Sequence, residues 1–154
     1  MAQNAAITAH CAIKIAQPYL KTTFPDTPTL IIGWGRIGKC LSKLLKAMDC
    51  PVTVAARNPA HRATLRALGY GAQDTAHLSL KGYKLLFNTA PEPILTQSQL
   101  LPYPDLIKIE LASHPGLSGS DVISARGLPG IHAPETSGKL QFETITRYLK
   151  EDHP

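Results

Sequence analysis

The sequence is poor in the features that mark membrane, secreted and metal-binding proteins. No apolar run approaches the roughly 18 residues of a membrane-spanning helix, and Gln3 and Asn4 interrupt the N-terminal alanines where a secretory signal would be apolar. The three cysteines are odd in number and lack metal-type spacing, so we expect reduced thiols that serve as packing residues. No two of the six histidines lie four residues apart, as zinc ligands on one helix would. These absences predict a cytoplasmic protein with no membrane contact and no metal site.

Aromatic residues and net charge are also modest. The 154 residues include five Tyr and three Phe, the net charge is +5, and the basic residues are scattered along the chain. A nucleic-acid surface needs clustered basic residues interleaved with aromatics, so this pattern argues against nucleic acid and suits anionic small molecules better. With 44% hydrophobic and 18% charged residues, the composition is that of one ordinary globular domain.

One stretch combines an apolar run, a glycine-rich turn and an amphipathic helix. Leu30–Ile32 predicts a buried strand and leads directly into Gly-Trp-Gly-Arg-Ile-Gly at positions 33–38. In the residues that follow, apolar side chains recur at steps of 4, 7, 8 and 11 while lysines fall on the other side, which predicts a helix. These apolar residues are Ile37, Leu41, Leu44, Leu45 and Met48. Strand, turn and helix therefore come in the order that a dinucleotide site requires.

The glycines of the turn have distinct expected roles. Gly33 allows the sharp turn, Gly35 lets a pyrophosphate approach the backbone, and Gly38 lets the helix lie close to the strand. The unpaired N–H groups and the dipole of the first helical turn would then hold the phosphates. The alternative is a glycine-rich turn without a ligand. We expect the whole turn to bind a cofactor, that is Gly33, Trp34, Gly35, Arg36, Ile37 and Gly38.

The end of the second strand indicates which dinucleotide is bound. Val52–Ala56 predicts this strand, and Arg57 and Asn58 follow it where an NAD site carries an acidic residue. We expect no carboxylate near this place, and a guanidinium pairs with a 2′-phosphate through two parallel bonds, so we expect NADP(H), with NAD less favoured. Arg62, one helical turn further on, closes over the adenine, adds a second phosphate contact or is a solvated helix residue.

Further candidates follow the predicted fourth strand, Lys84–Asn88. In a doubly wound sheet, ligands bind beyond the carboxyl ends of the strands near the switch point. The residues at this end would supply neutral hydrogen bonds to the nicotinamide ribose, or they form a plain turn before prolines. They are Asn88, Thr89, Ala90 and Pro91.

The predicted fifth strand, Leu106–Leu111, ends in a loop that contains Ser113, which we also expect to contact the cofactor. His114 in this loop and His132 are candidates for a proton acceptor because imidazoles titrate near working pH. Each fits an ordinary loop histidine better, so no catalytic residue is assigned.

Weaker patterns predict the remaining elements. We expect a helix over 4–17 with Asn4 as its cap, a helix over 60–68 ended by Gly69, and a short third strand from Gly71. We also expect helical turns at 77–80 and 96–101, a helix over 121–126, a weak sixth strand at 128–131, and a last helix from Pro134. The inner face of that last helix is expected to comprise Gly138, Phe142, Ile145 and Leu149. The whole predicts an α/β protein with a doubly wound Rossmann fold: a mostly parallel six-stranded sheet with helices on both faces.

Several local signatures together resemble the C-terminal nucleotide-binding domain of the dipicolinate synthase A-subunit family. They lie at 33–38, 52–57, 87–91, 111–113 with 115–116, and 127–130 followed by 133–134 and 136–139. The last group is the most specific, and the resemblance covers nearly the whole chain. It implies a linking helix and lead-in over 1–28, an NAD(P)-binding Rossmann domain over 29–150 and a polar tail over 151–154. Because the family has an N-terminal domain before the linking helix, we expect half of a two-domain cleft to be absent from this chain.

The resemblance also implies a function. It suggests an NAD(P)-dependent oxidation of a small carboxylated substrate, a dihydrodipicolinate-type intermediate, to dipicolinate in spore formation, and its implied partner is a flavoprotein-like second subunit. The glycine turn, Arg57, the Asn88-Thr89 loop and the Ser113 loop would hold the cofactor, and Thr136 would face the nicotinamide or the substrate. The alternative is a non-catalytic nucleotide-binding module that needs a partner chain to complete a dehydrogenase cleft. In both cases we expect a homo- or hetero-oligomer.

Overall fold

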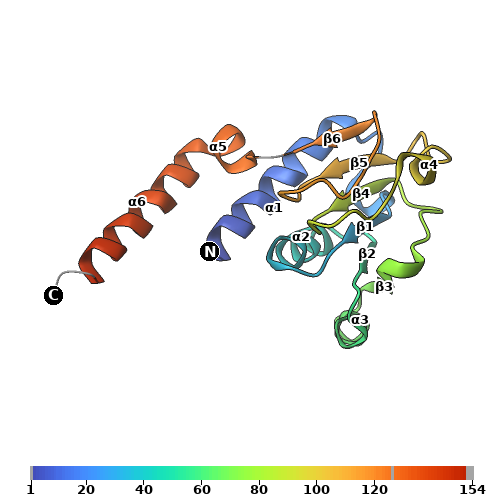
Figure 1. Ribbon diagram of the computed structural model, residues 1–154, viewed down its shortest axis with the longest axis horizontal. Helices are drawn as coiled ribbons and strands as arrows, with labels where there is room; N and C mark the ends of the chain where they lie inside the picture. Colours follow the sequence, from blue (N-terminus) through green and yellow to red (C-terminus); the bar gives the residue numbers. More distant parts are fainter. Residues whose placement is uncertain (1, 126, 152–154) are drawn as a thin grey trace.

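The computed structural model describes residues 2–125 and 127–151, which form a six-stranded sheet flanked by helices (Figure 1). The strand order is β3-β2-β1-β4-β5-β6, and every neighbouring pair is parallel. The strands are β1 Thr29–Ile32, β2 Val52–Ala55, β3 Gly71–Gln73, β4 Leu85–Asn88, β5 Ile107–Glu110 and β6 Val122–Ser124. From β1 the chain adds β2 and β3 on one side and then β4, β5 and β6 on the other, so the switch point lies between β1 and β4. The predicted doubly wound Rossmann fold is confirmed.

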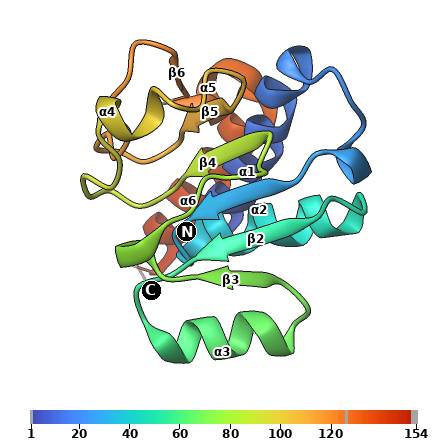
Figure 2. The same cartoon turned by 90° about the vertical axis from the view of Figure 1, so that its right-hand side faces the viewer.

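One face of the sheet is covered by long helices, as Figure 2 shows from the side. These are α1 Ala2–Ala16, α2 Arg36–Ala47 and α3 Pro59–Ala67. On α2 the predicted apolar stripe is confirmed, since Leu41 and Leu45 are fully buried against strand residues such as Ile31. Of the cysteines, Cys11 and Cys50 are buried in this layer, and burial raises the pKa of both thiols. They therefore act as packing residues, as expected.

The opposite face is covered by shorter pieces. They are the 3-10 helix η3 Thr75–His77, the single-turn helix α4 Gln97–Leu100 and the connecting loops. Strand residues Leu30, Ile32 and Leu86 alternate with those of the first face and pack here. Strand β2 adds Ala55, helix α4 adds Leu100, and the loops supply the rest of this second core, namely Leu80, Leu95, Leu106 and Leu117.

Two predictions in the last third of the chain are wrong. The segment expected to be a helix over 121–126 contains strand β6, and the segment expected to be a strand at 128–131 is helix α5 Leu128–His132. β-branched Val122 and Ile123 favour an extended backbone, and Ile123 pairs beside Ile109 of β5. Pro129 has no N–H to donate to a neighbouring strand, but its fixed φ suits the first turn of a helix.

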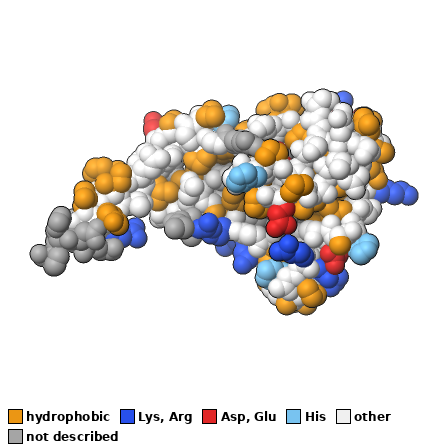
Figure 3. Space-filling view, viewed as in Figure 1, with side chains coloured by type: hydrophobic (Ala, Val, Ile, Leu, Met, Phe, Trp, Pro, Cys, Tyr) orange, Lys and Arg blue, Asp and Glu red, His pale blue; other side chains and the backbone are white. Residues whose placement is uncertain are grey.

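The last helix, α6 Pro134–Glu151, begins where predicted but does not bury the predicted face. Phe142, Ile145 and Leu149 are 71%, 59% and 58% exposed. The helix packs against α5 and α1 near its start and then extends away from the sheet, where its apolar side chains form an uncovered stripe (Figures 1 and 3). Of the predicted polar tail, Glu151 ends this helix and the other residues lie outside the described ones.

Smaller differences concern element ends. Helix α1 is already formed at Ala2, so Asn4 lies inside it and its carbonyl accepts a bond from Thr8 Oγ1; Asn4 is not the cap. The helical turn expected at 77–80 is instead η3, and the first helix is followed by 3-10 turns η1 Gln17–Tyr19 and η2 Phe24–Asp26. Over the described ranges, no helix has the length and apolar character needed to cross a membrane.

Candidate functional site

The glycine turn lies at the switch point of the sheet and depends on two of its glycines. Gly33 has a φ of +104°, and a Cβ there would lie 2.5 Å from Thr89 Oγ1. A Cβ on Gly38 would lie 2.2 Å from the Gly33 carbonyl oxygen. The N–H of Gly33 donates to the carbonyl of Ala55 at 2.9 Å, which continues the β1–β2 ladder into the turn. Gly33 and Gly38 are therefore required by the fold itself.

Gly35 is different, because no contact within the protein requires a glycine at this position. It is the N-cap of α2, its backbone is extended with φ −81°, and no atom lies within 4 Å of a Cβ built on it. Gly35, the N-cap, has no side chain to cap the first turn of α2, and Gly35, Arg36 and Ile37 all line a cleft, so this helix start opens into that space. Open space over an uncapped helix start fits the diphosphate of a dinucleotide.

A cleft of about 770 Å³ opens at this point, between the glycine turn, α1 and α6. Its polar walls are mainly hydroxyls and amides, and Arg36 is the charged residue among those that line it within the described ranges. The lining residues are Asn4, Ala5, Thr8, Gly35, Arg36, Ile37, Thr89, Ser137, Leu140, Gln141, Thr144 and Ile145. The cleft thus joins predicted site residues of the glycine turn and the β4 loop to the two terminal helices.

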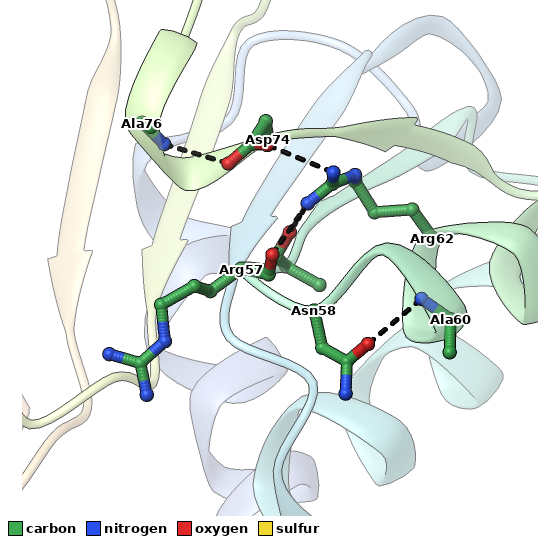
Figure 4. A network of polar contacts seen from close by, with 7 residues as sticks. Arg57, Asn58, Ala60, Arg62, Asp74 and Ala76 are labelled. Atoms are coloured by element: carbon green, nitrogen blue, oxygen red, sulfur yellow. Dashed lines mark hydrogen bonds and ion pairs between the residues drawn. The ribbon is translucent and has the colours of Figure 1, made fainter.

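The end of β2 carries Arg57 and Asn58, which have different surroundings (Figure 4). Asn58 is the N-cap of α3, and its Oδ1 accepts the N–H of Ala60 at 2.8 Å. The side chain of Arg57 is 83% exposed, and its Nη1 lies 3.4 Å from Oε2 of Glu92 in the loop after β4. The cation expected to bind a 2′-phosphate is therefore accessible, but it already has a carboxylate partner.

Arg62 supports the turn between β2 and α3. Its Nη1 donates to the carbonyls of Ala56 at 2.8 Å and Arg57 at 2.7 Å, and its Nη2 lies 2.9 Å from Asp74 Oδ2 (Figure 4). Asp74 follows β3 and also caps η3 by accepting the N–H of Ala76. Arg62 thus fixes the backbone that carries Arg57. The premise that no carboxylate is near this end of the site is wrong, since Asp74 and Glu92 arrive from distant parts of the sequence.

The residues at the end of β4 differ in their exposure to the cleft: one is buried below it and another lines it. Thr89 lines the cleft, and its Oγ1 donates to the carbonyl of Ile32 at 2.9 Å directly beneath the glycine turn. Asn88 is fully buried, and its amide is used within the protein by Ala90 and Glu110. Pro91 is exposed beside Glu92. The structure therefore brings Thr89 into the cleft, while Asn88 lies below the surface.

Glu110, which the sequence did not single out, is a buried carboxylate at the carboxyl end of β5. It accepts the N–H groups of Ala112, Gly116 and Leu117 at 2.8 to 2.9 Å, and Asn88 Nδ2 at 2.9 and 3.0 Å. The carboxylate therefore ties the loop after β5 to the loop after β4. The available signal was an acidic residue inside an otherwise apolar strand, because such a residue is buried only when it is well paired.

The same strand buries a second charge. Lys108 Nζ donates to Tyr103 O at 2.8 Å and lies 2.5 Å from Asp121 Oδ2. The bond from Lys108 lowers the pKa of the Asp121 carboxyl below its ordinary value. Tyr103 and Asp121 precede β5 and β6, so this pair lies toward the amino edge of the sheet, away from the glycine turn.

The other predicted residues are more scattered. Ser113 is exposed after β5, and its Oγ lies 3.3 Å from Nδ1 of the neighbouring His114. Thr136 is exposed in the first turn of α6, whereas the next residue, Ser137, is buried and lines the cleft. The ring of Trp34 packs edge-on against Tyr70 with centroids 6.0 Å apart. Contact of these side chains with a cofactor stays a prediction.

Comparisons with known proteins agree with the family resemblance. No protein-family model matches the chain. The dipicolinate synthase A-subunit of Bacillus subtilis (strain 168) is 30% identical over 159 residues, which span 96% of this chain and 54% of that protein. The crystal structure of this Bacillus subtilis protein gives a TM-score of 0.87 at 28% identity, covering 97% of this chain and 54% of its own. The dipicolinate synthase A-subunit from Bacillus halodurans gives a TM-score of 0.88 at 26% identity, with 96% and 55% covered.

A more distant structure shares the fold alone. CAD from Helicobacter pylori, complexed with NADP(H), is 21% identical with a TM-score of 0.53, covering 78% of this chain and 33% of that one. The resemblance to the dipicolinate synthase A-subunit is thus confirmed over nearly the whole chain, which spans about half the length of these relatives.

Proposed function

We propose that this chain is the NADP(H)-binding part of an oxidoreductase similar to the dipicolinate synthase A-subunit. The observation that carries the proposal is the open space over Gly35, at the uncapped start of α2 and on the wall of the 770 Å³ cleft. An N-cap glycine that no protein contact requires is explained if a ligand approaches the backbone there.

The chain's residues divide the binding task along the carboxyl edge of the sheet. The amides that open α2 would hold the diphosphate, and Arg57 would meet the adenosine end, where a 2′-phosphate can displace Glu92 from the guanidinium. Thr89 keeps the turn in shape and faces the cleft from the β4 side. When bound, the nicotinamide would supply hydride transfer, and the protein would orient its ring toward the substrate.

The expected reaction follows the relatives rather than any residue in the cleft. By likeness to the dipicolinate synthase A-subunit, we infer oxidation of a dihydrodipicolinate-type compound to dipicolinate in spore formation in the cytoplasm. Because the chain spans about half of these relatives, we expect the remaining substrate contacts to come from a further domain or a partner chain, such as a flavoprotein-like second subunit. The uncovered apolar stripe of α6, beside the cleft, supports such an attachment.

A second candidate function is a nucleotide-binding module without catalysis of its own. It is favoured by the cleft walls, which within the described residues offer hydroxyls, amides and one guanidinium but no imidazole, carboxylate or ammonium. A dehydrogenase must also move a proton, so the group that does so would have to come from elsewhere. Turnover of a dihydrodipicolinate-type substrate by the chain alone would exclude this candidate.

Titration of the chain with NADPH and NADH, followed by nicotinamide fluorescence, tests the proposal. We expect saturable binding of NADPH and weaker binding of NADH. A Gly35→Ala variant should lose about tenfold or more in affinity for both while staying folded, since its Cβ meets open space in the protein but fills the approach to the helix start. Gly130→Ala, another glycine with open space around it, is the matched control. Binding of neither cofactor at millimolar concentration would refute the proposal.

A further inference from the structure

The buried carboxylate of Glu110 is the most densely bonded side chain at the carboxyl edge of the sheet. The residue is 2% exposed, and the structure gives it five short contacts with donors. Oε2 accepts the N–H groups of Gly116 and Leu117, Oε1 accepts that of Ala112, and the amide of Asn88 reaches both oxygens. A buried carboxylate with this many N–H partners is a strong and directional anchor.

The anchor joins two loops into one unit. Asn88 uses the rest of its amide on the next loop, donating to Ala90 O at 3.0 Å and accepting Ala90 N–H at 3.1 Å. Gly116 fits beneath that loop so closely that a Cβ would lie 2.4 Å from Asn88 Nδ2 and 2.5 Å from Glu92 O. The backbone of the β5 loop therefore cannot move without moving the loop that carries Thr89 and Glu92.

Thr89 connects this unit to the glycine turn. Its N–H and its Oγ1 both donate to the carbonyl of Ile32, at 2.8 and 2.9 Å, and the side chain fills the space that a Cβ on Gly33 would need. Contacts thus run without a gap from Glu110 through Asn88 and Thr89 to the backbone that precedes the helix start.

Lys108 shows what a purely structural buried charge on this strand does. It shares a face of β5 with Glu110, but its partners Tyr103 and Asp121 lie toward the amino edge, Asp121 at the far end of the connection from β5 to β6. Lys108 is buried as deeply as Glu110 but forms its ion pair at the opposite edge of the sheet, so the Lys108–Asp121 pair serves as an internal reference for any effect of Glu110.

We propose that Glu110 is a positioning residue for dinucleotide binding, which holds the loops after β4 and β5 in the conformation that the glycine turn requires. The proposal rests on the proposed function, because it assigns Glu110 a role in that same cleft. Glu110 acts through Asn88 and Thr89 and does not itself line the cleft.

The test compares Glu110→Gln with Asp121→Asn, each of which replaces a carboxylate by an amide of the same shape. In Glu110→Gln an NH2 group replaces one carboxylate oxygen, so at least one backbone N–H that this oxygen accepted faces another donor. In the ligand-free chain we expect faster hydrogen exchange at Gly116 and Leu117, by about tenfold, and a displaced Gly33 amide resonance in ¹⁵N NMR spectra. NADPH affinity should fall about tenfold. Asp121→Asn should leave the Gly33 resonance in place and change affinity by less than about twofold.

A second variant guards against failure of Glu110→Gln to fold. Gly116→Ala keeps the carboxylate but pushes on Asn88 and on the loop that carries Glu92. It should also shift Gly33 and weaken NADPH binding. The proposal is overturned if either variant loosens the β5 loop while the Gly33 resonance and the affinity stay as in the wild-type chain. If the wild-type chain binds no dinucleotide, the proposed function fails, and an unmoved Gly33 resonance would separately overturn the coupling to Glu110.

Discussion

Different kinds of contact stabilise the two ends of the sheet's carboxyl edge, one near β2 and β3 and the other near β4 and β5. Near the ends of β2 and β3, Arg62 donates to two backbone carbonyls and pairs with Asp74. Exposed Arg57 pairs with Glu92 from the loop after β4. After β4 and β5, a buried carboxylate grips three backbone amides and a buried side-chain amide. The exposed side chains near β2 and β3 can exchange their ion-pair partners for a ligand, whereas the buried bonds after β4 and β5 hold the backbone rigidly.

The difference has an energetic basis. Exposed ion pairs contribute about 0 to 1 kcal/mol because water and salt screen them, so a ligand phosphate can displace the 60% exposed Glu92 carboxylate at little cost. Breaking a buried charged network costs on the order of 3 to 5 kcal/mol, since the remaining partners lose their bonds without regaining water. We therefore propose that the exposed end discriminates between cofactors and that the buried end fixes the shape of the site.

The glycine turn, where both ends meet, gives the largest expected effect. In Gly38→Val the Cβ would lie 2.2 Å from the Gly33 carbonyl, so α2 must move away from β1. We expect a loss of about 3 kcal/mol in the free energy of unfolding, measured by urea denaturation, together with the loss of NADPH binding. Gly35→Ala is the control for stability, because its Cβ meets open space. A Gly38→Val chain as stable as the wild type would contradict the close packing described.

At the amino edge of the sheet, away from both ends of the cleft, Asp121→Asn should have an intermediate effect that depends on pH. Removing the charge that faces buried Lys108 should cost about 1 to 2 kcal/mol at neutral pH, less than for a fully buried pair since Asp121 is half exposed. The pKa of Asp121 is lowered in the folded state, so its contribution is present above the ordinary carboxyl pKa and is lost as pH falls through the folded value.

Urea denaturation of both chains from pH 7 downward measures this difference. The gap between wild type and Asp121→Asn should close as pH falls below about 4, and the gap between wild type and Lys108→Met should shrink over the same range, because the pairing of the two side chains is mutual. A gap that stays constant down to pH 2 would mean that the charge of Asp121 contributes nothing.

The exposed end should give the smallest changes in stability but should alter cofactor preference. Arg57→Ser should weaken NADPH by about 1 kcal/mol and NADH little, because the guanidinium is expected to contact only the 2′-phosphate. Glu92→Gln should tighten NADPH by about threefold, since the phosphate no longer displaces or faces a carboxylate. Glu143→Gln on α6 removes the same charge at a residue that does not line the cleft and is the matched control for the fluorescence titrations. Equal changes for NADPH and NADH would contradict this assignment.

Local patterns were enough to predict the centre of the fold. The glycine turn, the apolar stripe of α2 and the strands β1, β2, β4 and β5 all follow from periodicity within short windows, and the structure confirms them. Strand β6 and helix α5 were exchanged because elements of three and five residues are decided by tertiary pairing rather than by propensity.

Partners that are distant in sequence could not be predicted. Glu92 lies 35 residues from Arg57, and Glu110 meets Asn88 across 22 residues, so neither contact has a local signature. Amphipathicity correctly indicated that one face of α6 is apolar, but it carries no information on what covers that face. These contacts are the ones that set the charge and the rigidity of the candidate site.

The most direct test follows the backbone amides of the ¹⁵N-labelled chain during titration with NADPH. If the open start of α2 receives the diphosphate, the resonances of Gly35, Arg36 and Ile37 shift together and saturate at the affinity obtained from nicotinamide fluorescence. Unchanged resonances at these three residues, with saturable shifts elsewhere in the chain, would contradict the central claim.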